Sequence, residues 1–138
     1  MTLGLSNTAG FNWPVRVYYE DTDAGGVVFY ANYLKFFERA RTELLRSYGF
    51  EQDVLMAEQG LIFVVRSVKI DYLRPARFNE QLAVSAKVIE IKKTNLTFEQ
   101  AVTRQEQILC TGEVRIACLD AESMKPKPIP SVILEQLN

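Results

Sequence analysis

The chain has 138 residues, of which 48% are hydrophobic and 24% are charged. This composition is typical of one ordinary globular domain, and the length leaves little room for a second. A formal net charge of −1 provides no overall field that would favour nucleic acid. The absence of histidine excludes Ser-His-Asp and Cys-His triads and the usual zinc sites. Catalysis must therefore rely on carboxylates, backbone dipoles, or Tyr, Ser, Thr, Lys and Cys side chains, and we expect no metal.

The sequence predicts neither export nor membrane insertion. Residues 1–12 are polar and contain glycine, without a basic start or a long apolar run, so we expect a flexible tail and no signal peptide. No window approaches the roughly 18 apolar residues of a membrane span. Cys110 and Cys118 lie in one strand-like segment, roughly 26 Å apart if it is straight, which is too far for a disulfide. Reduced thiols without an export signal predict a cytoplasmic protein.

The first half of the predicted domain (13–138) combines a strand with a long helix. Residues 13–20 are rich in Val and Tyr, which favours a strand, and 21–29 read as a loop. From 31 to 48 apolar residues recur at three- and four-residue steps, which predicts an amphipathic helix of about five turns. Gly49 is placed to end this helix.

A short second helix is predicted at 51–58, and after Gly60 the apolar period changes from helical to alternating. The first alternating segment, 61–73, has an apolar face that is interrupted by Arg66 and formed by Ile62, Val64, Val68, Ile70 and Tyr72. Three more such segments follow, with short polar turns between them, and Gln100 interrupts the face of one. Four consecutive strands of this kind predict an antiparallel meander. We therefore expect an α+β hotdog fold, a five-stranded antiparallel sheet wrapped around one long central helix.

The loop before the long helix concentrates groups that can do chemistry. Asp21, Thr22 and Asp23 precede a helix start, whose unpaired N–H groups carry roughly half a positive charge and can polarise a carbonyl. Gly25 and Gly26 lack a Cβ atom, so an acyl group could approach the backbone closely. A carboxylate beside a polarised carbonyl could attack it or deprotonate a water, which suffices for a thioester. Simple capping of the helix by Asp is the alternative.

Two motifs in this region resemble a known family. The pattern Tyr-x-Asp-Thr-Asp-x-x-Gly-Val-Val-(Phe/Tyr) spans 19–29, and Tyr-x-x-Phe-(Phe/Tyr)-Glu-x-Ala-Arg spans 33–41. Together they resemble the signature of the 4-hydroxybenzoyl-CoA thioesterase family of hotdog enzymes, and they are most similar to the members associated with the Tol–Pal system. The resemblance runs from about residue 13 to 130. It implies an acyl-CoA thioesterase without a cofactor, because coenzyme A is part of the substrate.

The resemblance also assigns residues to the site. The family's catalytic aspartate falls on Asp23, as nucleophile or general base, and its carbonyl-polarising backbone N–H falls on Tyr30. Tyr19 matches a tyrosine beside the site, and Gly26 and Val27 are expected to contact the substrate. Many relatives have His in place of Tyr30, so a histidine contribution cannot operate here, whereas the backbone N–H is unaffected.

Basic residues are the candidates for binding the phosphates of coenzyme A. The turn Lys92-Lys93-Thr94 matches a basic turn that contacts the nucleotide in hydroxybenzoyl-type relatives, and a solvated hairpin turn is the alternative. Arg66 could pair with a carboxylate, lie at a subunit edge or reach a phosphate.

The resemblance implies an oligomer, with a dimer as the minimum and a tetramer of two dimers as the common form. Hotdog subunits pair edge to edge into a continuous sheet and place their sites at that interface. On the helix, Glu38 and Arg41 could form an i,i+3 ion pair. Two other functions remain open: a hotdog dehydratase, which generally needs a His, and a non-catalytic acyl-binding module that docks acyl carrier protein. The acyl group of the substrate stays undetermined.

Overall fold

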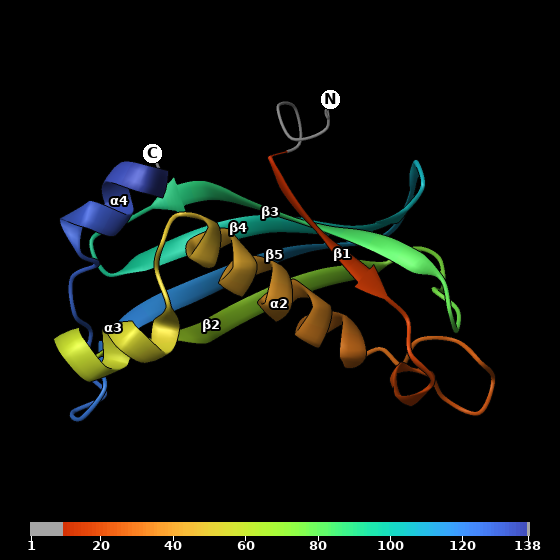
Figure 1. Cartoon of the computed structure of the whole chain (residues 1–138), viewed down its shortest axis with the longest axis horizontal. Coiled ribbons are helices and arrows are strands. Elements are labelled where there is room, and N and C mark those ends of the chain that lie inside the picture. Colours follow the sequence, from red (N-terminus) through yellow and green to blue (C-terminus); the bar gives the residue numbers. More distant parts are fainter. Residues whose placement is uncertain (1–9, 138) are drawn as a thin grey trace.

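The computed structural model describes residues 10–137 and has the α+β hotdog architecture that the sequence predicts (Figure 1). Its elements in chain order are β1 (Phe11–Arg16), the 3-10 helix η1 (Tyr19–Asp21), α2 (Asn32–Ser47), α3 (Gln52–Gln59), β2 (Leu61–Tyr72), β3 (Gln81–Ile91), β4 (Asn95–Arg104), β5 (Gln107–Asp120) and α4 (Ser131–Leu137). Most of the predicted tail, 1–12, lies outside the described residues, and β1 already begins at Phe11. None of the described helices is long and apolar enough to cross a membrane.

The five strands form one antiparallel sheet in the order β1-β3-β4-β5-β2. Short hairpins join β3, β4 and β5 as predicted, but β2 pairs with β5 rather than β3, so the predicted four-strand meander is wrong. The connection 73–80 is not a hairpin, because it passes beside the loop before α2, where Val28 N donates to Ala76 O at 2.8 Å. This crossover leaves β1 and β2 as the two edges of the sheet.

Strand β2 contains a β-bulge at Arg66, where its register with β5 shifts. The extra residue reverses the alternation of side chains between the two faces of the sheet. Leu61 and Phe63 therefore contact the core before the bulge, whereas Ile70 does so after it. The predicted apolar face, which began with Ile62, is wrong on the N-terminal side of the bulge for this reason.

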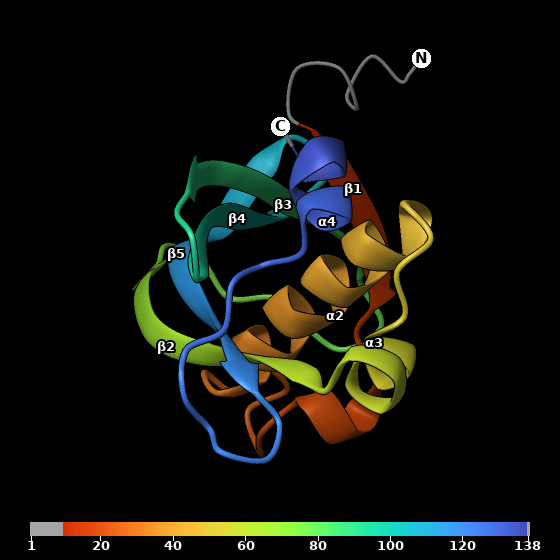
Figure 2. The ribbon, with the colours of Figure 1, turned by 90° about the vertical axis from the view of Figure 1, so that its left-hand side faces the viewer.

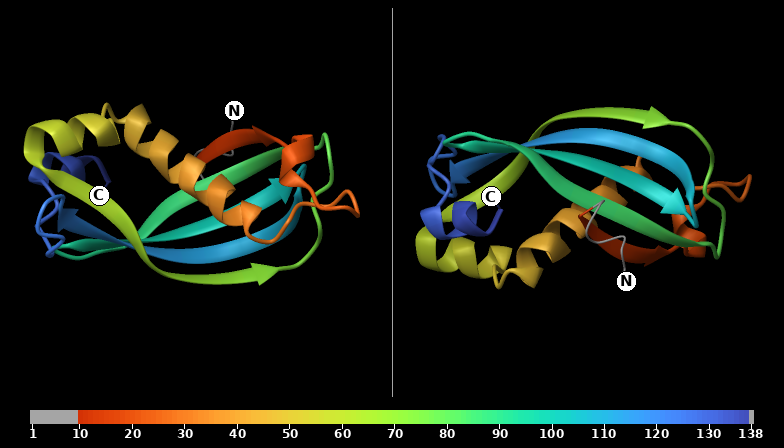
Figure 3. Two further views of the ribbon diagram at one scale, coloured as in Figure 1. Left: turned by 90° about the horizontal axis from the view of Figure 1, so that it is seen from below. Right: turned by 90° about the horizontal axis from the view of Figure 1, so that it is seen from above.

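Helix α2 lies in the hollow of the curved sheet (Figures 2 and 3). Phe36 and Phe37 are fully buried there. Gly112 of β5 allows this close approach, because a Cβ atom at that position would overlap the Phe37 ring and come within 3.0 Å of its Cζ atom. The helix ends as predicted, since Gly49 has a left-handed φ of 91°. The short second helix, α3, is also confirmed.

A polar cluster crosses the otherwise apolar core between α2 and the sheet. Arg41 Nη1 donates to Gln100 Oε1 at 2.9 Å, and both side chains are buried. Gln100 Nε2 in turn donates to Phe37 O at 3.0 Å and to Ser85 O at 3.1 Å. Among the described residues Arg41 forms no ion pair with Glu38, so the expected i,i+3 pair is wrong. The strand glutamine, which had interrupted an apolar face, supplies the partner instead.

Candidate active site

The loop between η1 and α2 is a small hairpin docked on the β2–β3 connection. Isolated bridges pair Thr22 with Val28 and Val27 with Arg77. Within the loop Asp23 N donates to Val27 O at 2.9 Å, and Gly26 N donates to Asp23 O at 3.0 Å. Gly26 has a φ of 79°, a backbone conformation that glycine adopts without strain. The loop is thereby held as a defined turn against the sheet.

Asp23 lies at the exposed tip of this hairpin. Its Oδ1 atom accepts a hydrogen bond from Gly25 N at 2.8 Å. Its Oδ2 atom has no hydrogen-bond partner among residues 10–137. One carboxylate oxygen is thus anchored to the backbone while the other is free to meet a substrate or a water.

The backbone N–H groups just before α2 include that of Tyr30. The N–H groups of residues 32–34 donate to the carbonyl groups three residues earlier, and Val28 and Phe29 donate to Ala76 O and Asp21 O. For the N–H groups of Tyr30 and the following residue, the described part of the chain contains no acceptor. Unpaired N–H groups at a helix start can polarise a carbonyl oxygen. The position that the resemblance assigns to this role therefore has a donor available.

A buried carboxylate braces the two ends of this loop. Asp21 is only 6% exposed, and its Oδ1 accepts from Asn32 Nδ2 at 2.6 Å while its Oδ2 accepts from Tyr18 N at 2.8 Å. The Asp21 carbonyl also accepts from Phe29 N at 3.1 Å. One residue thus joins the loop's entry to the first residue of α2. The sequence analysis had not assigned Asn32, although an asparagine at a helix start is a typical capping signal.

Aromatic side chains surround the helix start. The ring centroids of Tyr30 and Tyr72 are 4.7 Å apart, and the Tyr72 hydroxyl donates to Tyr30 O at 3.2 Å. The hydroxyl of Tyr33 accepts from Ala76 N at 3.0 Å, and burial raises the pKa of Tyr33. Tyr19 is 79% exposed and meets Phe78 edge-on at 5.7 Å. Tyr72, at the end of β2, was not assigned from the sequence because its pairing with Tyr30 spans 42 residues.

A cavity of about 270 Å³ has Tyr30 in its lining. Its lining includes Val27 and Tyr30 from the predicted site, and Tyr72, Leu73 and Arg74 from the end of β2. An acyl thioester could therefore approach the helix start between the loop and the sheet.

One chain does not bring all the predicted residues together. The turn at Lys92, Lys93 and Thr94 follows β3, whose 11 residues span roughly 36 Å. It lies at the end of the sheet near α4 (Figure 1), and Ile129 N, just before that helix, donates to Lys93 O. Asp23 is at the opposite end of the sheet. Arg66 is exposed in the middle of the edge strand β2. Contacts of these residues with the same substrate would require a second subunit.

Comparison with known proteins identifies the family of this chain. The model of the thioesterase-like superfamily matches residues 17–137. The chain belongs to this superfamily. An acyl-CoA thioesterase YbgC from Haemophilus influenzae is 49% identical over 90% of this chain and 91% of its own length. The acyl-CoA thioester hydrolase YbgC of Escherichia coli O6:H1 is 46% identical over 94% of this chain and 97% of its own length.

Solved structures of the superfamily share the fold. A probable thioesterase from Bartonella henselae superimposes with a TM-score of 0.83 at 38% identity, covering 86% of this chain and 98% of its own. A thioesterase-like protein therefore shares the architecture described here. The family predicted from the two sequence motifs is confirmed.

Proposed function

We propose that this protein hydrolyses acyl-CoA thioesters to the free acid and coenzyme A. The observation that carries the proposal is that one short loop holds both an Asp23 carboxylate oxygen and a Tyr30 N–H that have no hydrogen-bond partner within residues 10–137. YbgC relatives at 46–49% identity, which are named as acyl-CoA thioester hydrolases or thioesterases, support the same reaction.

The reaction needs only these two groups and a water. The thioester carbonyl oxygen accepts the Tyr30 N–H, which stabilises the negative charge that develops on it. In one route Asp23 takes a proton from water, the hydroxide adds to the carbonyl carbon, and the C–S bond breaks to release the thiolate. In the other route Asp23 attacks the carbonyl carbon itself, and the C–S bond breaks to release the thiolate and leave a mixed anhydride. Water then hydrolyses the anhydride and restores the Asp23 carboxylate, and in both routes the thiolate takes up the proton that water gives up. Both routes end with a carboxylate and a thiol.

The substitution Asp23→Asn tests the proposal without disturbing the loop. Asparagine retains the Oδ1 atom that accepts Gly25 N, so the turn should persist. We expect turnover of an acyl-CoA panel to fall by about two orders of magnitude or more, as is typical when a base or nucleophile is lost. Unchanged turnover would refute the role of Asp23, whereas a wild-type protein that binds acyl-CoA without hydrolysing it would favour a non-catalytic acyl-binding module.

We further propose that the working unit is a dimer formed through β2. This strand presents 12 residues at the edge of the sheet, and Val65 and Val68 on it are 49% and 37% exposed. A long, partly apolar edge is a template for pairing with another strand. A second copy paired antiparallel would bring the Tyr72 end of one β2 beside the Leu61 end of the other. A tetramer of two such dimers stays a prediction.

The substitution Val68→Lys tests the interface, because a lysine on an edge strand opposes pairing. We expect analytical ultracentrifugation to show a shift from dimer toward monomer. A variant that sediments like the parent protein would place the interface elsewhere. Acyl carrier protein as a partner, an association with the Tol–Pal system and a cytoplasmic location also stay predictions.

A further inference from the structure

A second, smaller cavity of about 130 Å³ lies between α2, α3 and the sheet. Its apolar wall is formed by Leu45, Phe63, Leu96, Phe98 and Ile116. An engineered apolar cavity of about 150 Å³ is known to hold benzene, so this one has room for roughly five or six carbon atoms. It is separate from the cavity at Tyr30, because no residue lines both.

The polar wall of the cavity contains a buried cation. Arg41 is 6% exposed, and one of its N–H groups donates to Gln100 Oε1. A guanidinium has five N–H donors, and the described residues supply no acceptor for the other four. Burial lowers the pKa of Arg41 to about 10, and the charge of Glu38 opposes this shift. None of the Arg41 nitrogens is a fully buried atom without a partner in residues 10–137, so the remaining donors are open to the cavity or to solvent.

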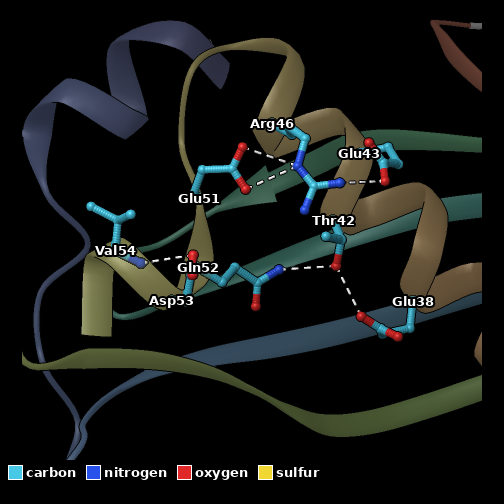
Figure 4. A network of polar contacts seen from close by, with 8 residues as sticks. All are labelled: Glu38, Thr42, Glu43, Arg46, Glu51, Gln52, Asp53 and Val54. Atoms are coloured by element: carbon cyan, nitrogen blue, oxygen red, sulfur yellow. Dashed lines mark hydrogen bonds and ion pairs between the residues drawn. The ribbon is translucent and has the colours of Figure 1, made fainter. Parts of the chain in front are cut away.

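The remaining polar residues of the lining, Glu38, Thr42 and Gln52, form a hydrogen-bonded chain (Figure 4). Gln52 Nε2 donates to Thr42 Oγ1 at 3.0 Å, and Thr42 Oγ1 donates to Glu38 Oε2 at 2.9 Å. The Glu38 side chain is exposed and engaged with this hydroxyl rather than with the guanidinium. The free donors of Arg41 are therefore left to an incoming acceptor.

We propose that this cavity binds a short-chain carboxylate, whose charged end pairs with Arg41 and whose hydrocarbon lies against Phe98 and Ile116. Guanidinium and carboxylate match in charge and geometry, and two parallel hydrogen bonds between them are common. The proposed function supplies one source of such a ligand, because thioester hydrolysis releases a free acid. Binding itself does not depend on hydrolysis, so it can be tested without turnover.

Isothermal titration with hexanoate and with 1-hexanol tests the site directly. We expect wild type to bind hexanoate about tenfold or more tightly than hexanol, and Arg41→Gln to lose that preference, because a hydrogen bond to a charged group is lost. Thermal unfolding checks that the variant folds. Equal hexanoate affinity in wild type and Arg41→Gln would overturn the proposal.

Glu38→Gln is the matched variant, and its exposed position makes misfolding no concern. Removing a like charge beside the site should tighten hexanoate binding about two- to threefold, because nearby like charges repel. Weaker hexanoate binding together with tight hexanol binding would mean that the ligand donates a hydrogen bond to Glu38. That result would identify a hydroxyl group as the ligand and overturn the carboxylate.

Steady-state kinetics then tests whether the product is the source. If the cavity takes the product, hexanoate inhibits turnover of hexanoyl-CoA and Arg41→Gln relieves the inhibition at least about threefold. Hexanoate binding without inhibition would overturn the link to catalysis. An inactive enzyme that still binds hexanoate would instead refute only the proposed function.

Discussion

Removing the Asp21 carboxylate should lower both the free energy of unfolding and kcat, although Asp21 is not the reacting group. Asp21→Ala deletes the acceptor of two hydrogen bonds, from Asn32 Nδ2 at 2.6 Å and from Tyr18 N at 2.8 Å. Both donors would be left without their partner at a site that is 6% exposed. The Asp21 carbonyl and its bond from Phe29 N would remain.

The magnitude follows from these two bonds. A hydrogen bond to a charged group contributes about 1.5–3 kcal/mol, so the loss should lower the free energy of unfolding by roughly 3–6 kcal/mol. For a domain of this length each 1 kcal/mol corresponds to about 3–5 °C in Tm, which gives a decrease of roughly 10–30 °C. Urea denaturation at constant m-value measures the free energy directly.

A double-mutant cycle of Asp21→Ala with Asn32→Ala measures the interaction between these two side chains. Because these two side chains are in direct contact, the cycle should show a coupling of about 1–3 kcal/mol. Asn32→Ala does not alter the Asp23 and Tyr30 residues themselves, so a lower kcat in this variant would report that the start of α2 has moved. A coupling near zero, or an Asp21→Ala loss below about 1 kcal/mol, would refute the view that this carboxylate positions the loop.

Three further predictions concern packing, titration and the basic turn. Gly112→Ala should cost about 1–3 kcal/mol by overpacking against Phe37, and Phe37→Leu should restore part of that loss in urea denaturation. Burial raises the pKa of Cys110 from 9.0 to about 12. Between these pH values the thiol ionises in the unfolded chain but not in the folded one, so the free energy of unfolding falls by about 1.4 kcal/mol per pH unit as pH rises. Cys110→Ala should reduce this slope in unfolding curves measured at alkaline pH. Replacing Lys92 and Lys93 by Ala should raise KM more for CoA esters than for pantetheine esters, and equal effects would favour a solvated turn.

The sequence predicted the elements of this fold better than their pairing. The helix at Asn32–Ser47 and the strand at Gln81–Ile91 have strong local periodicity, and both lie where the pattern placed them. Hairpins are local as well, so the pairing of β3 with β4 followed from the short turn between them. The pairing of β2 with β5 joins segments about 50 residues apart, and no local signal distinguishes it from a meander.

The site shows the same division. Asp23 and the Tyr30 N–H lie in one contiguous motif, which made them accessible to sequence reasoning. The hydrogen bond of Asn32 to Asp21 spans 11 residues, and that of Tyr72 to Tyr30 spans 42. These partners are visible only once the chain is folded, because a polar side chain shows no preference for a distant partner in its own sequence pattern.

Interruptions of an apolar face carried more information than the faces themselves. Arg66 interrupts β2 because it is the extra residue of a bulge. The bulge reverses which side chains face the core on its N-terminal side. Gln100 interrupts β4 because a helix residue, Arg41, needs a buried acceptor. Burying an unpaired polar group costs free energy. A polar residue at a core-facing position of a strand therefore implies a polar partner across the core. Arg41 has that partner for one donor only, and its remaining donors explain why the adjoining cavity should select an acceptor.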